Sequence, residues 1–410
     1  MGVSMVWQNK KLKNITTKIG SGATPNGGQS SYKKDGTPLI RSLNVYDLSF
    51  ERNDLAFIDD DQAGQLANVE VKEGDVLLNI TGASVCRCTA VPNDLVPARV
   101  NQHVSIIRAD RINLDGKYLK YVLVSFPYKK QLLGLARTGA TREALTKTDI
   151  EEFEINLPSL EVQTGIASVL STYDDLIEVN EKRIKILEEI AQRLYTEWFV
   201  KFKFPGHEKV RMVDSGTEYG LIPEGWEVKR LGDFTNITMG QSPISEHYNQ
   251  DKVGFPFHQG VADFGNLYPM DRVYSTHGNK FAEKDDLLFS VRAPVGRINI
   301  SNKKIILGRG LCAIQHINSL QVLLFLMFTQ RFTEKDMIGN GAIYKSVNKN
   351  EIEGLKFLCA TDKLATSFEE MVKFYYEEIE RLTLLDENLQ KTRDLLIPKL
   401  VNGKRELKYL

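Results

Sequence analysis

The sequence predicts an α+β fold in which two mixed domains alternate with two long helices. Residues 74–85, GDVLLNITGASV, return in similar form as DDLLFSVRAPVG at residues 285–296. Two stretches without Gly or Pro, residues 166–204 and 362–397, carry apolar side chains at heptad spacing. Short strands followed by one long helix, given twice, indicate a duplicated domain with its connector rather than a solenoid of short repeats.

Further phrases recur in the same order and confirm the internal repeat. Trp7 and Leu12 in WQNKKL have counterparts in WEVKRL at residues 226–231, and the turn Gly22-Ala-Thr-Pro25 has one in Gly240-Gln-Ser-Pro243. The later matches are residues 101–104 with 308–311, 138–139 with 340–341, Leu145 with Val347, and 149–150 with 351–352. Each copy therefore takes about half of the 410 residues.

Upstream of each helix the pattern is typical of short strands separated by turns. The predicted strands are residues 76–80, 104–108, 287–291, 298–300, 305–307 and 311–315. They are rich in β-branched and aliphatic residues, and glycine-rich clusters such as residues 20–28 interrupt them. Extended phrases at residues 153–158 and 355–359 lead into the two helices.

The two helices have apolar seams with four-three spacing. The first seam is Ile166, Leu170, Tyr173, Ile177, Asn180, Ile184, Leu187, Ala191, Leu194 and Trp198. The second is Phe368, Val372, Tyr375, Ile379, Leu382, then Leu385 or Asp386, followed by Leu389 and Leu396. A seam this long favours pairing of one helix with the other, and packing against the preceding domain is the alternative. A buried Asn180 would cost stability and fix the register.

These patterns predict domain bounds along the chain. Residues 1–158 form a first domain and residues 159–204 a first helix. Residues 205–360 form a second domain, and residues 361–410 form a second helix with a tail. At ~1.5 Å per residue, each helix is roughly 55 Å long, a length on the scale of the DNA helical repeat.

Composition indicates a globular protein of the cytoplasm. The chain is 42% hydrophobic and 26% charged, and it has neither a membrane-spanning apolar run nor the apolar core of a signal peptide. Its four cysteines form no Cys-x-x-Cys pair and its six histidines show no metal-ligand spacing. We expect reduced thiols and no bound metal.

The formal net charge is zero, but the charges are unevenly distributed. Residues 287–333 contain no acidic side chain. The basic side chains in this stretch are Arg292, Arg297, Lys303, Lys304, Arg309 and Arg331. Such a basic stretch mildly favours contact with nucleic acid.

No catalytic motif stands out in the sequence. The Asn-Pro-Pro-aromatic loop of base-amino methyltransferases, the P-loop and the Gly-x-Gly-x-x-Gly fingerprint do not occur. Asp61 with Glu70 and Lys72 resembles a nuclease pattern, but Asp61 has no preceding proline and the second copy has no counterpart. A strand leading into the turn at Gly74 is the favoured interpretation, so we predict a non-catalytic chain.

The ordered phrases together resemble the specificity (S) subunits of type I restriction-modification systems, over essentially the whole length. The resemblance rests on Pro223-Glu-Gly-Trp226 with Leu231, the Gly-x-Thr/Ser-Pro turns, Lys72-Glu-Gly-Asp-Val-Leu-Leu78, Thr138-Gly-Ala with Leu145, Ile155-Asn-Leu-Pro158, Leu187-Glu-Glu-Ile-Ala-Gln-Arg-Leu194 with Trp198-Phe199, and Leu396-Ile-Pro-Lys-Leu-Val-Asn-Gly-Lys404. The second copy departs from the pattern at Asp286 and at Leu358-Cys359.

The resemblance implies a division of labour between domains and helices. Each α+β domain would be a target-recognition domain that reads one half of a bipartite double-stranded DNA site. The helices would pair as an antiparallel coiled coil, set the unread gap and dock two modification (methyltransferase) subunits. S-adenosylmethionine, ATP and Mg²⁺ would be bound by those subunits and by the restriction (motor-nuclease) subunits, and this chain would bind no cofactor.

Loop residues that differ between the copies and suit base or phosphate contacts are the DNA-binding candidates. In the first copy they are Thr24, Asn26, Gln29, Lys33, Lys34, Arg41, Asn44, Thr81, Ser84, Arg87, Arg137 and Arg142. In the second copy they are Gln241, Ser242, His258, Gln259, Arg292, Arg297, Arg309, Tyr344 and Lys345.

Two other classes of function remain open from the sequence. The chain could be a coiled-coil adaptor that binds only proteins, although the basic stretch 287–333 argues against it. It could also be a DNA-cleaving enzyme with an unrecognised site, although the missing motifs argue against that.

Overall fold

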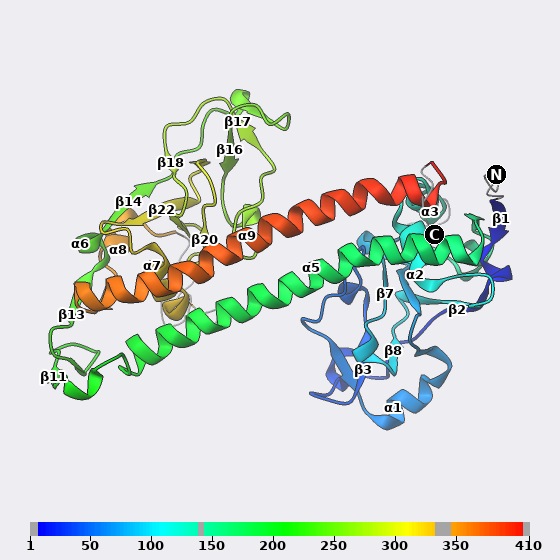
Figure 1. Cartoon of the computed structure of the whole chain (residues 1–410), viewed down its shortest axis with the longest axis horizontal. Helices are drawn as coiled ribbons and strands as arrows, with labels where there is room; N and C mark the ends of the chain where they lie inside the picture. Colours follow the sequence, from blue (N-terminus) through cyan, green and yellow to red (C-terminus); the bar gives the residue numbers. More distant parts are fainter. Residues whose placement is uncertain (1–6, 138–142, 333–345, 405–410) are drawn as a thin grey trace. The chain divides into compact units, whose positions relative to one another are not determined.

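The computed structural model describes residues 7–137, 143–332 and 346–404. The chain divides into two compact units: unit 1 is residues 1–180 with 385–410, and unit 2 is residues 181–384. Two long helices, α5 (Leu160–Tyr195) and α9 (Asp362–Val401), each contribute one part to each unit (Figure 1). The predicted fold class, two repeated mixed domains with two long paired helices, is confirmed.

In unit 1, two sheets form the domain. The strands of the first sheet lie in the order β2-β9-β6-β7, and those of the second in the order β4-β3-β8-β5. These strands are β2 (Thr16–Ser21), β9 (Val104–Ala109), β6 (Val76–Asn79), β7 (Cys88–Ala90), β4 (Ala56–Ile58), β3 (Thr37–Ile40), β8 (Ala98–Val100) and β5 (Glu70–Val71). A separate pair, β1 (Gln8–Lys11) with β10 (Glu154–Leu157), runs antiparallel just before α5.

Short helices cover the first sheet of unit 1 and connect it to α5. They are α2 (Gly116–Val124), α3 (Phe126–Arg137) and α4 (Lys147–Glu151). Helix α1 (Asp60–Gln65) packs instead in the core cluster of the second sheet. Tyr118, Tyr121 and Leu132 from α2 and α3 are buried in one core cluster with Leu78 of β6 and Leu170 of α5. The domain and the helix therefore share a hydrophobic core.

Unit 2 repeats this plan with different lengths. Its sheets have the orders β14-β22-β19-β20 and β15-β17-β16-β21-β18. The strands are β14 (Thr235–Met239), β22 (Leu311–His316), β19 (Leu287–Ser290), β20 (Ile298–Ile300), β15 (Tyr248–Asn249), β17 (Tyr274–Ser275), β16 (Phe255–His258), β21 (Ile305–Leu307) and β18 (Phe281–Ala282). The helices are α6 (Leu231–Phe234), α7 (Gln321–Arg331) and α8 (Lys349–Glu353).

Two further strand pairs flank these sheets. Strand β13 (Glu227–Arg230) pairs with β23 (Lys356–Cys359) just before α9, as β1 and β10 do before α5. The predicted strands and the two extended phrases all occur, with ends that differ by at most one residue. A hairpin of β11 (Met212–Asp214) and β12 (Leu221–Pro223) lies in the connection from α5 to the second domain.

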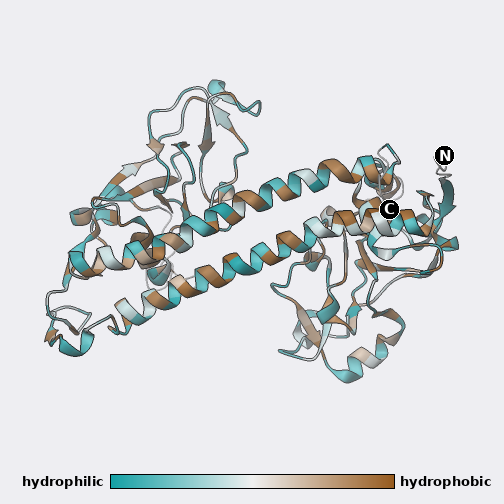
Figure 2. Cartoon of the chain, viewed as in Figure 1, coloured by the Kyte–Doolittle hydropathy of each residue, from teal (hydrophilic) through white to brown (hydrophobic). Residues whose placement is uncertain are grey.

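Within each unit, α5 and α9 run antiparallel and bury their seams against each other. In unit 1, Ile166 and Leu170 share a core cluster with Ile397 and Leu400. In unit 2, the seam of α5 from Ile184 onward lies in one cluster with Phe368, Val372 and Ile379. Figure 2 shows the alternating hydrophobic and hydrophilic bands along both helices. The predicted pairing of the two helices is thus observed.

The first helix begins within one residue of the predicted start but ends before Phe204. Helix α5 begins at Leu160, before Gly165, and a π-helical turn from Thr196 to Val200 continues it. The predicted helical segment to Phe204 is wrong, because Phe202 has a left-handed backbone with φ of 58°. The π-turn contributes Phe199 to an aromatic cluster, where the centroid of its ring lies 4.8 Å from that of the Phe368 ring.

Helix α9 continues past Ile397, through Pro398, to Val401. A proline inside a helix lacks one backbone donor and normally breaks the helix. Here Ile397, Leu400 and Val401 are buried in the core of unit 1, and this packing holds the last turn in helical conformation. The carbonyl of Pro398 accepts a hydrogen bond from the Asn402 side chain at 2.8 Å.

A buried polar pair interrupts the seam at Asn180. The Asn180 amide donates to the Asp386 carboxylate at 2.6 Å, and both residues are buried. Asp386 is therefore the seam residue and Leu385, 43% exposed, is not. Burial raises the pKa of Asp386, while the hydrogen bond from Asn180 acts in the opposite direction.

Each domain is anchored to the helices by a different polar contact. In unit 1, Asp174 of α5 accepts hydrogen bonds from Lys120 at 2.7 Å and Tyr121 at 2.6 Å, and it pairs with Arg393 of α9 at 2.8 Å. In unit 2, Glu369 of α9 accepts from the backbone N–H groups of residues 322 and 323 at the start of α7. A carboxylate at a helix N-terminus is stabilised by the free N–H groups and the helix dipole.

The repeated phrase begins each central strand, with an aspartate at its start. Asp75 is fully buried, accepts from the Lys72 N–H and forms an ion pair with Arg108 at 2.7 Å. Asp286 accepts from the Glu283 N–H, but Gln315 occupies the position that matches Arg108. Burial without that cation raises the pKa of Asp286 to about 6.

We expect Asn180→Ala to destabilise unit 1 by about 1–3 kcal/mol, because the buried Asp386 carboxylate loses its partner. Replacing Asn180 and Asp386 together by leucine should recover much of this loss, since an apolar pair leaves no polar group unsatisfied. Urea denaturation measures both effects. Asn388→Ala, at an exposed site on α9, is the control, and equal midpoints for Asn180→Ala and Asn388→Ala would contradict the expectation.

Candidate nucleic-acid interface

In unit 1, the loops that follow four strands meet at one edge of the domain. Strands β2 and β6 both run antiparallel to β9, and β3 runs parallel to β8. The Gly22 N–H donates to the Asn101 carbonyl at 3.1 Å, and the Asn101 N–H donates to the Ile40 carbonyl at 3.1 Å. We call residues 22–34, 41–50, 80–87 and 101–103 the loop edge of unit 1.

Unit 2 has a corresponding edge with the same strand directions. Strands β14 and β19 run antiparallel to β22, and β16 runs parallel to β21. The Gln241 N–H donates to the Leu307 carbonyl at 2.9 Å, and the Gly310 N–H donates to the Gln259 carbonyl at 3.1 Å. Residues 240–248, 258–260, 291–297 and 308–310 form the loop edge of unit 2.

Glycine is required where the loops approach each other most closely. A Cβ atom at Gly22 would lie 1.7 Å from the Val100 carbonyl oxygen, and one at Gly240 would lie 2.1 Å from the Gly308 oxygen. These are the glycines of the two Gly-x-Thr/Ser-Pro turns. The repeated turn thus joins the two sheets at each loop edge, which explains its recurrence in the sequence.

Most of the predicted DNA-binding residues of the first copy lie on its loop edge. Arg87 stacks over the Tyr46 ring at 4.4 Å, and Arg41 lies over the Tyr32 ring at 5.4 Å. Lys33 pairs with Asp59 at 3.2 Å. The remaining described candidates on this edge are Thr24, Asn26, Gln29, Lys34, Thr81 and Ser84. Stacking on Tyr46 holds the Arg87 guanidinium in place while leaving its edge open to a ligand, whereas the Arg41 guanidinium donates to the Asp54 carbonyl.

Arg137 lies apart from these residues in sequence, at the C-terminal end of α3. Its guanidinium donates to Glu143 at 2.9 Å, and the Glu143 carbonyl in turn accepts from the Gly82 N–H at 3.0 Å. Arg137 therefore lies near the loop that follows β6.

In the second copy, the loop edge brings together Gln241, Ser242, Gln259, Arg292 and Arg309. The Ser242 hydroxyl accepts from the Arg309 backbone N–H at 3.2 Å. Arg292 is exposed and its backbone forms a bridge with Ser346. Arg297 is exposed on the far side of the same hairpin, where its N–H donates to the Ser290 hydroxyl at 2.8 Å.

Two candidates are buried and the prediction is wrong for them. Asn44 is fully buried, accepts from the Arg41 N–H at 3.0 Å and donates to the Glu51 carbonyl, so it holds its own loop. His258 is also fully buried and pairs with Asp271 at 3.1 Å. Side chains with no exposed surface cannot contact DNA. The candidates Arg142, Tyr344 and Lys345 lie outside the described residues.

Sequence reasoning missed Gln102, His103 and Tyr46 on the loop edge of unit 1. In the internal repeat, residues 101–104 correspond to residues 308–311, so Gln102 is the counterpart of the candidate Arg309. That correspondence could have identified Gln102. No comparable signal existed for Tyr46, because only the fold brings it under Arg87.

The described part of the chain offers no cluster of three or more His, Cys, Asp or Glu side chains that could hold a metal ion. The four cysteines are free, and burial raises the pKa of the Cys86 and Cys359 thiols to about 12. These thiols therefore stay protonated near neutral pH. None of the described helices combines the length and apolar character needed to cross a membrane.

A family model and several known proteins match this chain. A family model described as the type I restriction modification DNA specificity domain matches residues 6–189 and 223–358. The chain is 29% identical to the putative type I restriction enzyme MjaX specificity subunit of Methanocaldococcus jannaschii, over 98% of this chain and 94% of that protein. It is 22% identical to the type I restriction enzyme HindI specificity subunit of Haemophilus influenzae, over 84% and 89% of the two chains.

The fold is also similar to a crystal structure of the S subunit of a type I restriction-modification system from M. genitalium. The TM-score is 0.63 at 16% identity, with 100% of this chain and 98% of that chain covered. The shared fold thus includes both repeats and both long helices.

We expect Arg292→Ala and Arg297→Ala to weaken DNA binding in different ways. If Arg292 reads a guanine, its loss should cost about 1–3 kcal/mol and relax one base pair only. If Arg297 holds a phosphate, its loss should weaken all sequences similarly and lower the salt slope by about one. Selection from a randomised bipartite duplex library at two salt concentrations measures both. Variants that bind like the parent would show that this edge does not face DNA.

Proposed function

Since the chain belongs to the type I restriction-modification DNA specificity family, we propose that it is the sequence-specific DNA-recognition subunit of such a system. The observation that carries the proposal is the pair of loop edges. Both are built on the same strand ends and the same close glycine contacts, yet they present different side chains. A common scaffold with different exposed amide, hydroxyl and guanidinium groups suits the reading of two different short sequences.

Each unit reads one part of a bipartite DNA site. The loop edge of unit 1 presents hydroxyl, amide and arginine side chains, and two segments of the loop edge of unit 2, residues 291–297 and 308–310, lie within the acid-free stretch 287–333. Base edges in the major groove are distinguished by such donors and acceptors. Because the two edges share no side chains, the two half-sites have independent sequences.

The long helices set the number of base pairs between the half-sites. Their paired seams make them stiff connectors, and the polar pair of Asn180 and Asp386 fixes the register of that pairing. A change in helix length should therefore change the gap without changing either half-site.

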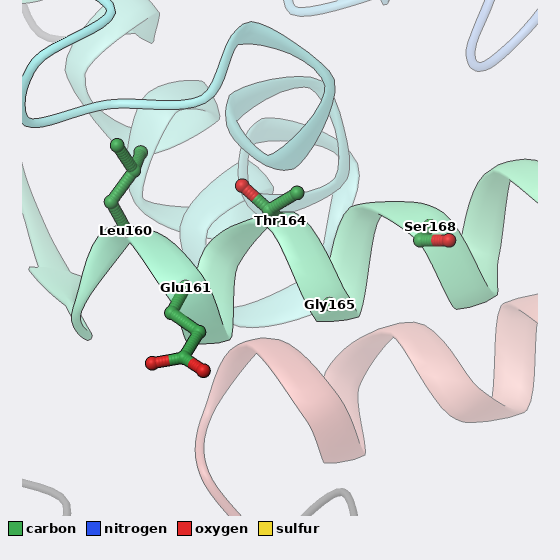
Figure 3. A pocket seen from close by; sticks show the side chains of 5 residues that line it. All are labelled: Leu160, Glu161, Thr164, Gly165 and Ser168. Atoms are coloured by element: carbon green, nitrogen blue, oxygen red, sulfur yellow. The ribbon is translucent and has the colours of Figure 1, made fainter. Parts of the chain in front are cut away.

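The exposed side of α5 supports docking of two modification (methyltransferase) subunits. Besides its buried seam, α5 carries exposed apolar side chains in each unit: Val169, Leu176 and Val179 in unit 1, and Ile186 and Ile190 in unit 2. At its start, a shallow groove is lined by Leu160, Glu161, Thr164, Gly165 and Ser168 (Figure 3). Exposed apolar side chains that lie together on a surface are typical of surfaces that bind another protein.

This chain acts without chemistry of its own. The modification subunits bring S-adenosylmethionine and methylate adenine, and motor-nuclease subunits that use ATP and Mg²⁺ join for cleavage. The chain acts in the cytoplasm, where these cofactors and the DNA are found together. The two alternatives, an adaptor that binds only proteins and a DNA-cleaving enzyme, receive no support from the family match.

The purified chain alone should transfer no methyl group from radiolabelled S-adenosylmethionine to DNA. With its modification subunit, label should enter adenine only in duplexes that carry both half-sites, because each loop edge supplies part of the binding energy. Duplexes with one scrambled half-site are the matched control. Methyl transfer by the chain alone, or equal labelling of scrambled duplexes, would count against the proposal.

Inserting one heptad into α5 after Ile184 and one into α9 at the facing turn near Leu382 should lengthen the preferred gap. Seven residues add ~10 Å at ~1.5 Å each, or about three base pairs. The control is seven residues inserted after Gly216, in the β11–β12 hairpin loop, which should leave the gap unchanged. Selection from duplexes with variable gaps measures the effect. An unchanged gap in the heptad variant would mean that the helices do not set the spacing.

A further inference from the structure

The turn between β8 and β9, residues 101–103, holds one exposed side chain in a fixed backbone. Asn101 is buried; its N–H donates to the Ile40 carbonyl, and its side chain accepts from the His103 N–H at 3.0 Å. Its carbonyl accepts from the Gly22 N–H at 3.1 Å. Gln102 therefore projects from a turn whose backbone is anchored on both sides, at the centre of the loop edge of unit 1.

A chain of side-chain hydrogen bonds orients the Gln102 amide. The Thr24 hydroxyl donates to Oε1 of Gln102, and Nε2 of Gln102 lies 3.2 Å from Nε2 of His103. An amide nitrogen can only donate, so this His103 nitrogen accepts and its Nδ1 carries the proton. That Nδ1 lies 2.6 Å from the Thr81 hydroxyl, to which it donates.

These contacts use only half of the hydrogen-bonding capacity of the Gln102 amide. One N–H and one lone pair of the carbonyl oxygen stay available to a ligand. A side-chain amide with one free donor and one free acceptor matches N7 and the N6 amino group of adenine in the major groove. Because Thr24 and His103 already fix the amide, binding loses little rotamer entropy.

The second unit has the same turn with a different exposed residue. Arg309 lies between Gly308 and Gly310, where added Cβ atoms would be 2.6 Å and 2.4 Å from the Gln259 backbone. The turn backbone thus packs directly on the end of β16, and the Ser242 hydroxyl holds the Arg309 N–H. An exposed guanidinium in this place matches O6 and N7 of guanine.

We propose that this turn is a specificity-determining position in both units, where Gln102 reads an adenine in one half-site and Arg309 reads a guanine in the other. Thr24 and His103 are positioning residues for Gln102. The inference rests on the proposed function and adds to it two base identities and the residues that choose them.

The test uses the full chain assembled with its modification subunit, and a randomised bipartite duplex library as the probe. Gln102→Ala should lower the preference for adenine at one base pair by about 5- to 150-fold and leave the other half-site unchanged. Gln102→Arg should convert that preference to guanine, and Arg309→Gln should make the reciprocal change. His103→Ala should weaken the preference at the same base pair as Gln102→Ala.

Gln8→Ala is the matched control and should bind like the parent. Gln8 is exposed on β1, which precedes the start of β2, whereas the loop edge follows the end of β2. The assignment is overturned if Gln102→Ala keeps every preference of the parent, or weakens all sequences equally as loss of a phosphate contact would. In either case, a parent assembly that still selects a bipartite site leaves the proposed function standing. A parent that selects no bipartite site would overturn both.

Discussion

The antiparallel pairing of α5 with α9 is the constraint on which both domains depend. In unit 1 the hydrophobic seams of the two helices complete the core of the domain itself, through Leu170 and Leu400. In unit 2, Phe368 of α9 packs against Phe199 at the end of α5 and against the domain core. Neither domain has a complete core without both helices, so each unit contains segments from both copies of the repeat.

The polar contact between Asn180 and Asp386 gives this pairing its register. A purely apolar seam can slide by a heptad at little cost, because leucine and isoleucine pack acceptably in several registers. An amide and a carboxylate buried in the seam must meet, since an unpaired buried polar group costs about 1–3 kcal/mol. The two side chains come from different copies of the repeat. Each copy therefore supplies a different polar group to the seam.

The two copies also differ in the contacts between each domain and the helices, and in the residues exposed at the loop edges. Asp174 joins unit 1 through lysine, tyrosine and arginine side chains, whereas Glu369 joins unit 2 through backbone N–H groups of α7. At the loop edges, close glycine contacts are retained while the exposed residues change from Gln102 to Arg309. A duplicated scaffold with separately varying contacts lets one chain recognise an asymmetric DNA site.

Local sequence patterns were enough to predict the repeat, the strands and the heptad seams, because these depend on the spacing of apolar residues and on turn glycines. The sequence left Leu385 and Asp386 as alternatives, and only the partner across the seam, Asn180, decided for Asp386. It also could not separate surface from interior among polar loop residues. Asn44 and His258 carry the right chemistry for DNA, yet the fold buries both. Gln102 gained its role only when the folded strands brought Thr24 and His103 beside it, because hydrogen bonds between residues far apart in sequence leave no local pattern.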